Sequence, residues 1–397
     1  MQHSQAQLPR IAIVGAGVGG LLLAHGLQKN GFEVVVYEKE KYLNERVREW
    51  TMLIHWALPT LHKLLPDHII DNLRSAYADQ WYPYDQEKEF LPYYNGMSGE
   101  LAFKVAVSAR RVSRTRLREV CAKGLDIRWG KQFADLQVPN SAGPVTIRFG
   151  DGDSATADVV FGADGSNSRT RRWLLGDEAS KTLDSEHIIA SGILKYKTAE
   201  QAVAVKMGYP MCTIAPVNDG VIFTALQSVP DPNDPVNWSF HVARAWKGKT
   251  DFLEGAEAIA KAKAMTTDPN ISEPFRSAIQ LIPDNANFTV TQLRYWETVP
   301  WDNKGGRVTL LGDAAHCVLP GRGQGLNHAL GDVDTLVSQF IRVKENGSTV
   351  IEALQAYEAD VFVRGPKAVR ESLEDTEAIM KVRNLEKSRQ AQKGMAL

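Results

Sequence analysis

The residues of this sequence best suited to chemistry begin with a glycine-rich turn near the N-terminus. Gly15, Gly17 and Gly20 follow a short apolar run and open a helical one, and Glu38 with Lys39 ends the next apolar run. Glycines at these positions permit a tight turn, close approach of backbone N–H groups to a pyrophosphate, and close packing of helix on strand. A carboxylate at the end of the second strand can accept hydrogen bonds from a ribose diol. The segment predicts a dinucleotide site at Gly15, Gly17, Gly20, Glu38 and Lys39, although it does not distinguish FAD from NAD. A Gly-rich turn that merely packs is the alternative.

A second glycine-rich segment lies almost three hundred positions further on. An apolar run from 306 ends at Asp313, and a loop containing Gly323 and Gly325 then precedes a helical pattern from Leu326. Glycines let backbone N–H groups come close to a ligand, and a helix N-terminus stabilises negative charge such as that of a reduced flavin. An ordinary surface loop would not need this run directly after a buried strand.

Two further motifs make the pattern specific. The segment 164–171 reads DGSNSRTR, which fits DGxxSxxR, and the segment 114–118 reads RTRLR, which fits RxxLR. Together with the two glycine segments, in this order, they resemble the single-component FAD-dependent aromatic hydroxylases, the para-hydroxybenzoate hydroxylase-like flavoprotein monooxygenases. Thr170 stands where relatives usually have an aliphatic residue. For Arg114 the less favoured alternative is a solvated charge on a helix face.

The resemblance implies positions for the cofactor. Asp313 would bind the ribityl chain of FAD, and Asp164 and Arg114 would support the cofactor. Relatives often place an arginine near the flavin after the second strand; either Arg46 or Arg48 could correspond, and the predicted site includes Arg48. Further members of the predicted site lie beside the flavin ring: Thr51, Gly323, Gln324, Gly325, Leu326 and Asn327.

The resemblance also implies the reaction. NADPH or NADH would reduce FAD as a transient co-substrate, and O2 would form a flavin C4a-hydroperoxide that hydroxylates or epoxidises a small hydrophobic aromatic or alkene substrate. Many relatives are fungal and serve natural-product pathways. The alternatives are an FAD oxidase or dehydrogenase without oxygen insertion, Baeyer–Villiger oxygenation, or a flavin-holding scaffold. A flavin halogenase fits less well, because the segment 296–301, WETVPW, does not match the WxWxIP segment of that group.

Catalytic side chains are not apparent, because the chemistry is carried by the flavin. The weak candidates are His316, directly after the 306–313 run, and Tyr196. Some relatives place an arginine and a tyrosine in the substrate sheet to deprotonate phenols, but Tyr196 is preceded by Leu194 and Lys195, so that mechanism is in doubt here. Cys317 fits a small buried hydrophobe better than a reactive thiol. No metal-binding spacing is present in the sequence.

Strand and helix patterns predict the elements that position these residues. The fold class is α/β: a doubly wound Rossmann-like FAD-binding domain with an inserted, largely antiparallel-sheet substrate domain and a helical C-terminus. We also expect a helix over 58–73, a loop or hairpin outside the sheet over 77–99, a strand over 203–207, and a helix from Thr349 that Pro366 ends or follows. The predicted boundaries are 10–75, 98–186 and 300–345 for the FAD-binding domain, 76–97 and 187–299 for the substrate-binding domain, and 346–397 for the C-terminal helices.

The composition of the chain limits the classes of binding partner that it can have. The 397 residues are 44% hydrophobic, and 46 Lys and Arg balance 47 Asp and Glu, which argues against nucleic acid or an anionic membrane as partner. Three well-separated cysteines suit a reducing compartment, so a cytoplasmic location is expected. The uncharged run 11–28 is long enough to suggest a membrane span, but its glycines favour strand–turn–helix. The expected partners are a small hydrophobic substrate and O2, and the chain is expected to be a monomer or homodimer.

Overall fold

A five-stranded parallel sheet forms one half of the molecule in the computed structural model, which describes residues 8–46, 49–84, 89–139, 143–207, 212–381 and 389–394. Its strand order is β18-β11-β1-β2-β7. All neighbouring pairs run parallel, so the predicted doubly wound α/β architecture is confirmed. The strands are β1 (Ile11–Val14), β2 (Val34–Glu38), β7 (Ile127–Trp129), β11 (Val159–Gly162) and β18 (Val308–Leu310).

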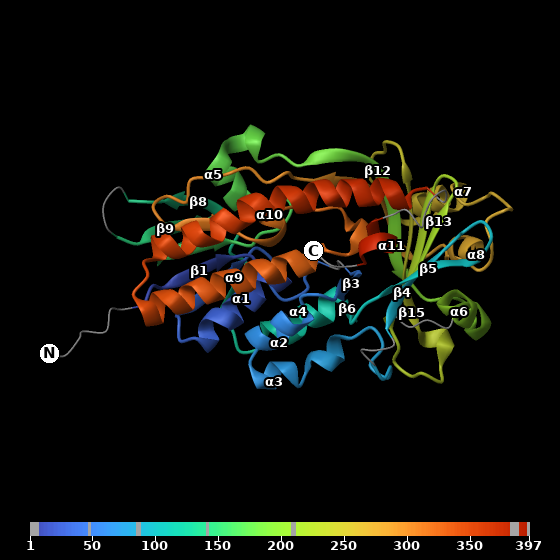
Figure 1. Cartoon of the computed structure of the whole chain (residues 1–397), viewed down its shortest axis with the longest axis horizontal. Coiled ribbons are helices and arrows are strands. Elements are labelled where there is room, and N and C mark those ends of the chain that lie inside the picture. The colour runs from blue at the N-terminus through green and yellow to red at the C-terminus, as the bar shows by residue number, and fades with distance from the viewer. Residues whose placement is uncertain are drawn as a thin grey trace.

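Helices cover this sheet, and their apolar faces are buried against it and against one another. The first, α1, is buried along most of its length and packs against α9 and α4, while α10 packs along α9 (Figure 1). Leu21, Leu22 and Leu23 are fully buried together with Leu336 and Phe340 of α9. The bounds are α1 (Val18–Lys29), α4 (Arg114–Ala122), α5 (Arg169–Ala179), α9 (Gly325–Asn346) and α10 (Val350–Ile379).

An eight-stranded sheet forms the other half, with the order β16-β17-β12-β15-β14-β13-β4-β5. Its pairs are antiparallel except for β13 and β4, so the largely antiparallel second sheet is confirmed. A second core packs on this sheet together with α6, α7 and α8. The bounds are β4 (Phe90–Tyr94), β5 (Leu101–Ala106), β12 (Leu183–Leu194), β13 (Thr213–Val217), β14 (Gly220–Ser228), β15 (Ser239–Lys247), β16 (Leu253–Glu254), β17 (Asn287–Tyr295), α6 (Ala199–Lys206), α7 (Gly255–Ala264) and α8 (Phe275–Gln280).

Smaller elements connect the two halves. β9 and β10 form a hairpin, and β3 pairs with β6 in a two-stranded ribbon. The remaining bounds are β3 (Thr51–Ile54), β6 (Arg110–Ser113), β8 (Phe133–Gln137), β9 (Val145–Phe149), β10 (Ser154–Ala157), α2 (Leu58–Leu64), α3 (Asp67–Ile70), α11 (Arg389–Lys393), η1 (Leu73–Ala76), η2 (Pro235–Asn237), η3 (Gly312–Ala314) and η4 (Pro320–Arg322).

One predicted element was wrong in the first half of the chain. The single helix over 58–73 is divided into α2, α3 and η1, because Pro66 forces Leu65 into an extended conformation with ψ 147°. The segment 77–99 lies outside the parallel sheet, as expected, and its end forms β4, which pairs with β5 in a hairpin and with β13 in the eight-stranded sheet. Proline thus occurs in two different settings in this region: Pro66 follows the end of a helix, whereas Pro92 lies within strand β4.

Two further predictions were wrong in the second half. The strand expected over 203–207 is the end of α6, which begins where the Thr198 hydroxyl accepts a hydrogen bond from Gln201 N at 3.3 Å. Pro366 does not end the helix that starts at Thr349, because α10 continues to Ile379. The capping box at Thr349 is present. Packing of α10 on α9 holds the turns around Pro366, although proline removes one helix hydrogen bond.

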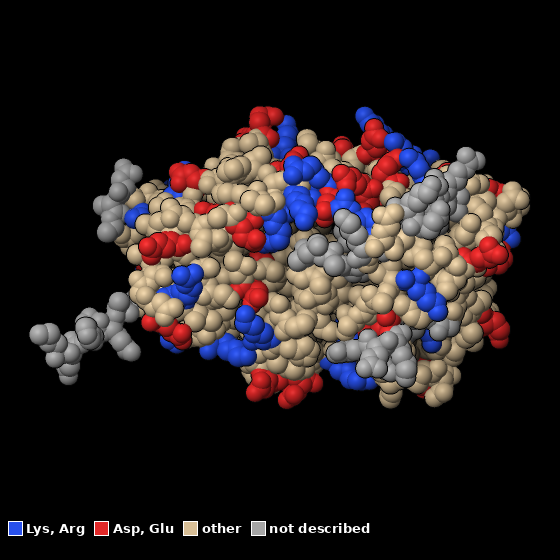
Figure 2. All heavy atoms as spheres, viewed as in Figure 1, with Lys and Arg blue, Asp and Glu red and all other residues tan. Residues whose placement is uncertain are grey.

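The surface carries no single-sign field on the visible face, where basic and acidic side chains alternate (Figure 2). Within the described ranges, no helix combines the length and the apolar character that crossing a membrane would need. The uncharged run from Ile11 forms β1, the glycine turn and α1, as expected.

Candidate functional site

A cavity of about 670 Å³ lies between the two halves of the molecule. One end is lined by the loops that follow the parallel strands β1, β2, β11 and β18, which is where doubly wound sheets bind their ligands. The other end is lined by the inner face of the eight-stranded sheet and by the end of α10. The cavity thus brings together segments that are almost three hundred residues apart in the sequence.

The first glycine turn has the geometry that the sequence predicts. Gly15 has φ +110°, and a Cβ atom there would lie 2.5 Å from the carbonyl oxygen of Ala163. Gly17 is the N-cap of α1, and no side chain accepts a cap hydrogen bond at this end. Gly15, Gly17, Gly20, Glu38 and Lys39 all line the cavity. A helix start of this kind, open to a cavity, suits an anionic pyrophosphate.

The carboxylate of Glu38 is engaged by the protein itself. One oxygen accepts from Ala16 N at 2.7 Å and the other from Glu40 N at 3.0 Å. Glu38 therefore fixes the turn, and its predicted contact with a ribose stays a prediction.

Arg118 completes this turn and was missed by the sequence reasoning. Its guanidinium is buried, donates to Ala16 O at 2.7 Å and to Glu40 Oε2 at 2.6 Å, and lies 3.8 Å from Glu38 Oε2. The signal was present, because Arg118 is the second arginine of the RxxLR motif from which only Arg114 was selected. Arg118 lines the cavity and positions the backbone that would meet the pyrophosphate.

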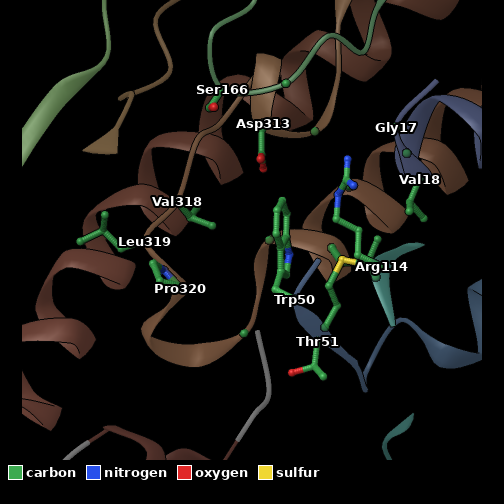
Figure 3. A pocket seen from close by; sticks show the side chains of 18 of the residues that line it. Gly17, Val18, Trp50, Thr51, Arg114, Ser166, Asp313, Val318, Leu319 and Pro320 are labelled. Atoms are coloured by element: carbon green, nitrogen blue, oxygen red, sulfur yellow. The ribbon is translucent and has the colours of Figure 1, made fainter. Parts of the chain in front are cut away.

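Arg114 lies deeper in the cavity, beside an aromatic ring. Its guanidinium stacks over the indole of Trp50 at 4.7 Å, and both side chains extend into the open space towards Asp313 (Figure 3). Arg46 also lines this space, whereas Arg48 lies outside the described residues. Positive charge therefore gathers at the end where a dinucleotide phosphate is expected.

Asp313 points into the cavity from the short η3 turn after β18 (Figure 3). Although its side chain is open to the cavity, the surrounding protein removes most of its water, and this desolvation raises the pKa of its carboxyl. The charges of His316, Arg171 and Arg114 act in the opposite direction. A carboxyl that is desolvated but open to a cavity is suited to accept hydrogen bonds from ligand hydroxyls.

The carboxylate of Asp164 forms hydrogen bonds within the loop that follows β11. It accepts from Arg169 N at 2.7 Å, from Thr170 N at 3.0 Å and from the Ser168 hydroxyl. Arg171, the last residue of the motif, is buried and donates to the carbonyl oxygens of Asp313 and Ala314 at 3.3 and 3.2 Å. The DG motif therefore ties the loop after β11 to the loop after β18, and both loops line the cavity.

The loop before α9 presents its backbone to the cavity. Gly323 has φ +62°, and Gly323, Gly325 and Leu326 line the cavity. The side chains of the other two predicted residues bind the β3 segment instead. Gln324 Oε1 accepts from Trp56 Nε1 at 2.7 Å, and Asn327 accepts from His55 N at 2.9 Å. Their role is to hold β3 against the loop.

The two weak catalytic candidates do not line the cavity. His316 Nε2 lies 2.6 Å from Asp332 Oδ2, in a buried cluster in which Arg364 donates to the other Asp332 oxygen at 2.6 Å. Tyr196 donates to Ala278 O at 2.8 Å inside the second core, and burial raises the pKa of its phenol. Both residues have structural hydrogen bonds.

Cys317 is buried, as its interpretation as a small hydrophobe requires. Burial and the nearby Asp313 raise the pKa of its thiol to about 12. A thiol with so high a pKa is protonated at neutral pH and a poor nucleophile.

The end of the cavity at the eight-stranded sheet is mostly apolar. Three of its polar side chains are linked to one another: Thr51, at the start of β3, Arg111 of β6 and His241 of β15. Sequence reasoning selected Thr51 but missed the other two, for which the sequence carries no local signal. The apolar lining includes Leu91, Ile189, Ile214, Val221, Phe223, Ala243, Leu293, Ile379 and Met380.

Comparison with known proteins agrees with this geometry. A family model described as FAD binding domain matches residues 105–372, and one described as NAD(P)-binding Rossmann-like domain matches residues 13–59. The chain is 35% identical over 370 residues to the FAD-dependent monooxygenase phnB of Penicillium herquei, covering 92% of this chain and 90% of phnB. It is 32% identical over 368 residues to the FAD-dependent monooxygenase cctM of Talaromyces islandicus, covering 91% of each.

A solved structure shows the same fold. The structure of Klebsiella pneumoniae HpxO with FAD and uric acid superposes with a TM-score of 0.75 at 20% identity, covering 98% of this chain and 93% of HpxO.

Fold and site together define a flavoprotein with a para-hydroxybenzoate hydroxylase-like architecture. With the family model covering more than half of its length, this chain belongs to the FAD-dependent monooxygenases, and to the fungal natural-product type among them. It is an oxidoreductase whose cofactor is FAD, and the Rossmann-like match supports NAD(P)H as co-substrate.

Proposed function

We propose that this chain uses NAD(P)H and O2, through its FAD, to hydroxylate or epoxidise a small hydrophobic aromatic or alkene compound. The observation that carries the proposal is one continuous cavity with two chemically different ends. One end has the glycine turn, Arg114 and Asp313, and the other is lined mainly by apolar side chains of the eight-stranded sheet. A hydrophobic molecule at the second end would lie directly beside a flavin held at the first.

The residues present fit FAD. A Cβ atom at Gly15 would clash with the backbone of Ala163, so glycine lets the loop after β1 pack on the loop after β11. Gly17 lines the cavity without a side chain, which leaves its backbone open to a pyrophosphate. Asp313 is open to the cavity at the place where a ribityl chain would pass (Figure 3), and Gly323 and Gly325 of the loop before α9 line the same space. When bound and reduced, FAD supplies the electrons that activate O2 for transfer of one oxygen atom to the substrate.

The protein contributes position and exclusion of water. The walls of the cavity come from both sheets and from the C-terminal part of α10, where Thr376, Ile379 and Met380 line it. Such enclosure favours oxygen transfer over loss of the oxygen as peroxide to water. We further propose that the chain divides into FAD-binding and substrate-binding parts, that it acts in the cytoplasm, and that it works as monomer or homodimer.

The test is isotopic. Purified FAD-loaded protein is screened with NADPH and NADH for aromatic and polyene compounds that accelerate oxidation of the nicotinamide, and the products formed under 18O2 are analysed by mass spectrometry. We expect a product heavier by one 18O atom. Stimulated NAD(P)H oxidation that yields only hydrogen peroxide, or product with no label, would show an oxidase or dehydrogenase instead. A lactone or ester product would show Baeyer–Villiger oxygenation.

A further inference from the structure

A buried arginine without an acidic partner lines the apolar end of the cavity. Arg111 is 5% exposed, and within the described ranges no carboxylate forms an ion pair with it. Its Nε atom is buried without a hydrogen-bond partner. Its neighbour Arg110 differs, since it pairs with Glu89 at 3.1 Å. A buried guanidinium is costly unless an anion or strong acceptors surround it.

The donor and the acceptor of each hydrogen bond around Arg111 can be assigned from the chemistry of the groups. Arg111 Nη1 donates to Thr51 Oγ1 at 2.8 Å, because a guanidinium has no acceptor. Thr51 Oγ1 lies 3.1 Å from His241 Nδ1, and Thr51 N lies 3.4 Å from the same atom. Backbone N–H can only donate, so Nδ1 is the acceptor and the proton of His241 is on Nε2.

The protonation state of His241 agrees with Nδ1 as the acceptor. Burial and the charge of Arg111 lower the pKa of His241 to about 3, so the ring is neutral at physiological pH. Its Nε2 makes no hydrogen bond to the described side chains, and the ring lines the cavity beside Phe223. Both ends of the Arg111–Thr51–His241 chain therefore carry hydrogen-bond donors. The guanidinium of Arg111 also meets the Cys212 thiol and lies 5.4 Å from the centre of the Phe223 ring, which are weak acceptors, and no carboxylate of the described ranges pairs with it.

Resting on the proposed function, we infer that Arg111 and His241 bind an ionised oxygen of the substrate, a carboxylate or an ionised phenol or enol. Two residues with N–H donors that line the same cavity and are linked through Thr51, one of them positively charged, select an acceptor with negative charge. The surrounding apolar side chains, among them Ile214, Val221 and Leu293, require that this oxygen belong to a hydrophobic molecule. Thr51 positions the two groups, because it links them. The charged oxygen would fix which part of the substrate faces the flavin.

The experiment compares anionic and neutral probes of the same shape on the FAD-loaded protein at neutral pH. The first pair is 2-naphthoate and its methyl ester, and the second pair is 2,4-dinitro-1-naphtholate and its methyl ether. Dissociation constants are taken from the change in flavin absorbance and from tryptophan fluorescence. We expect the anion of at least one pair to bind roughly 10- to 100-fold tighter than its neutral partner. The pair that shows the preference identifies the carboxylate or the phenolate as the favoured source.

Variants locate the preference. Arg111→Gln should bring the ratio of the two dissociation constants close to one, Arg111→Lys should retain part of it, and His241→Gln should reduce it several-fold. The matched control is Arg294→Gln, because Arg294 follows cavity-lining Leu293 on β17 but has an exposed side chain that pairs with Asp184. Its ratio should equal that of the wild type. Flavin retention and the circular dichroism spectrum report whether each variant is folded.

Two results would overturn the inference: wild-type protein that binds neither anion more tightly than its neutral partner, or folded Arg111→Gln that keeps the wild-type ratio. The first needs no variant, so a failure of Arg111→Gln to fold leaves the inference testable. Failure of the proposed function is separate. Anion preference without label from 18O2 would refute oxygen insertion and leave the anion site, and labelled product without anion preference would do the reverse.

Discussion

Replacement of Arg118 by methionine should destabilise the fold and loosen the first glycine turn. Arg118 is 2% exposed and sits between two carboxylates that are themselves buried, Glu38 and Glu40. It also donates to Ala16 O at 2.7 Å. Methionine fills much of the same volume but removes the charge, so Glu40 loses its partner at 2.6 Å.

The magnitude follows from the burial of the pair. Removing one partner of a buried ion pair costs about 3–5 kcal/mol, because the other charge is left uncompensated. The lost hydrogen bond to Ala16 is part of the same disruption and is not added. The assay is urea unfolding at neutral pH, followed by circular dichroism, together with the FAD content of the purified protein. The free energy of unfolding should fall by this amount, and the FAD content should fall with it.

Controls separate this effect from the loss of any arginine. Arg128→Met removes an arginine that is 60% exposed and pairs with Asp126 at the surface, and it should leave the free energy of unfolding close to that of the wild type. Adding Glu40→Gln to Arg118→Met should recover part of the lost stability, since the unpaired charge is then absent. Arg118→Met protein that unfolds within about 1 kcal/mol of the wild type and retains its FAD would refute the reasoning.

Three further predictions concern other parts of the site and its scaffold. Asp332→Asn should lower the free energy of unfolding at pH 7 by about 3–5 kcal/mol, because it removes the carboxylate between His316 and Arg364. Burial raises the pKa of Asp332, but His316 and Arg364 outweigh this and hold it well below its unfolded value of about 3.9. The stability that Asp332 contributes is therefore present above about pH 4 and is lost as the pH falls towards the folded pKa. The difference in the free energy of unfolding between wild type and Asp332→Asn should be smaller at pH 3 than at pH 7, and an equal difference at both pH values would contradict the reasoning. Asp313→Ala should purify without flavin, and a fully yellow variant with unchanged turnover would remove Asp313 from the site. Thr349→Ala should cost about 1 kcal/mol through loss of the cap of α10, measured by urea unfolding, and no change would show that the cap is not needed.

Local patterns in the sequence determined a large part of the fold. The glycine turn, the buried run that ends at Asp313 and the capping box at Thr349 were predictable, because turn chemistry and helix caps depend on residues that are close in the chain. Errors arose where tertiary packing outweighs local preference. Residues 203–207 look like a strand but continue a helix capped at Thr198, and α10 passes through Pro366 because its packing on α9 holds it.

Only the tertiary structure decided which charges meet. Nothing near Arg118 in the sequence shows that it faces Glu40, and residues 51, 111 and 241 come from three separate strands. Pairing of this kind depends on how the strands of two sheets are placed against each other, and the sequence periodicity of each strand does not contain that placement. The sequence alone therefore determined the dinucleotide end of the cavity, whereas the polar groups of its apolar end became visible only when the two sheets were brought together.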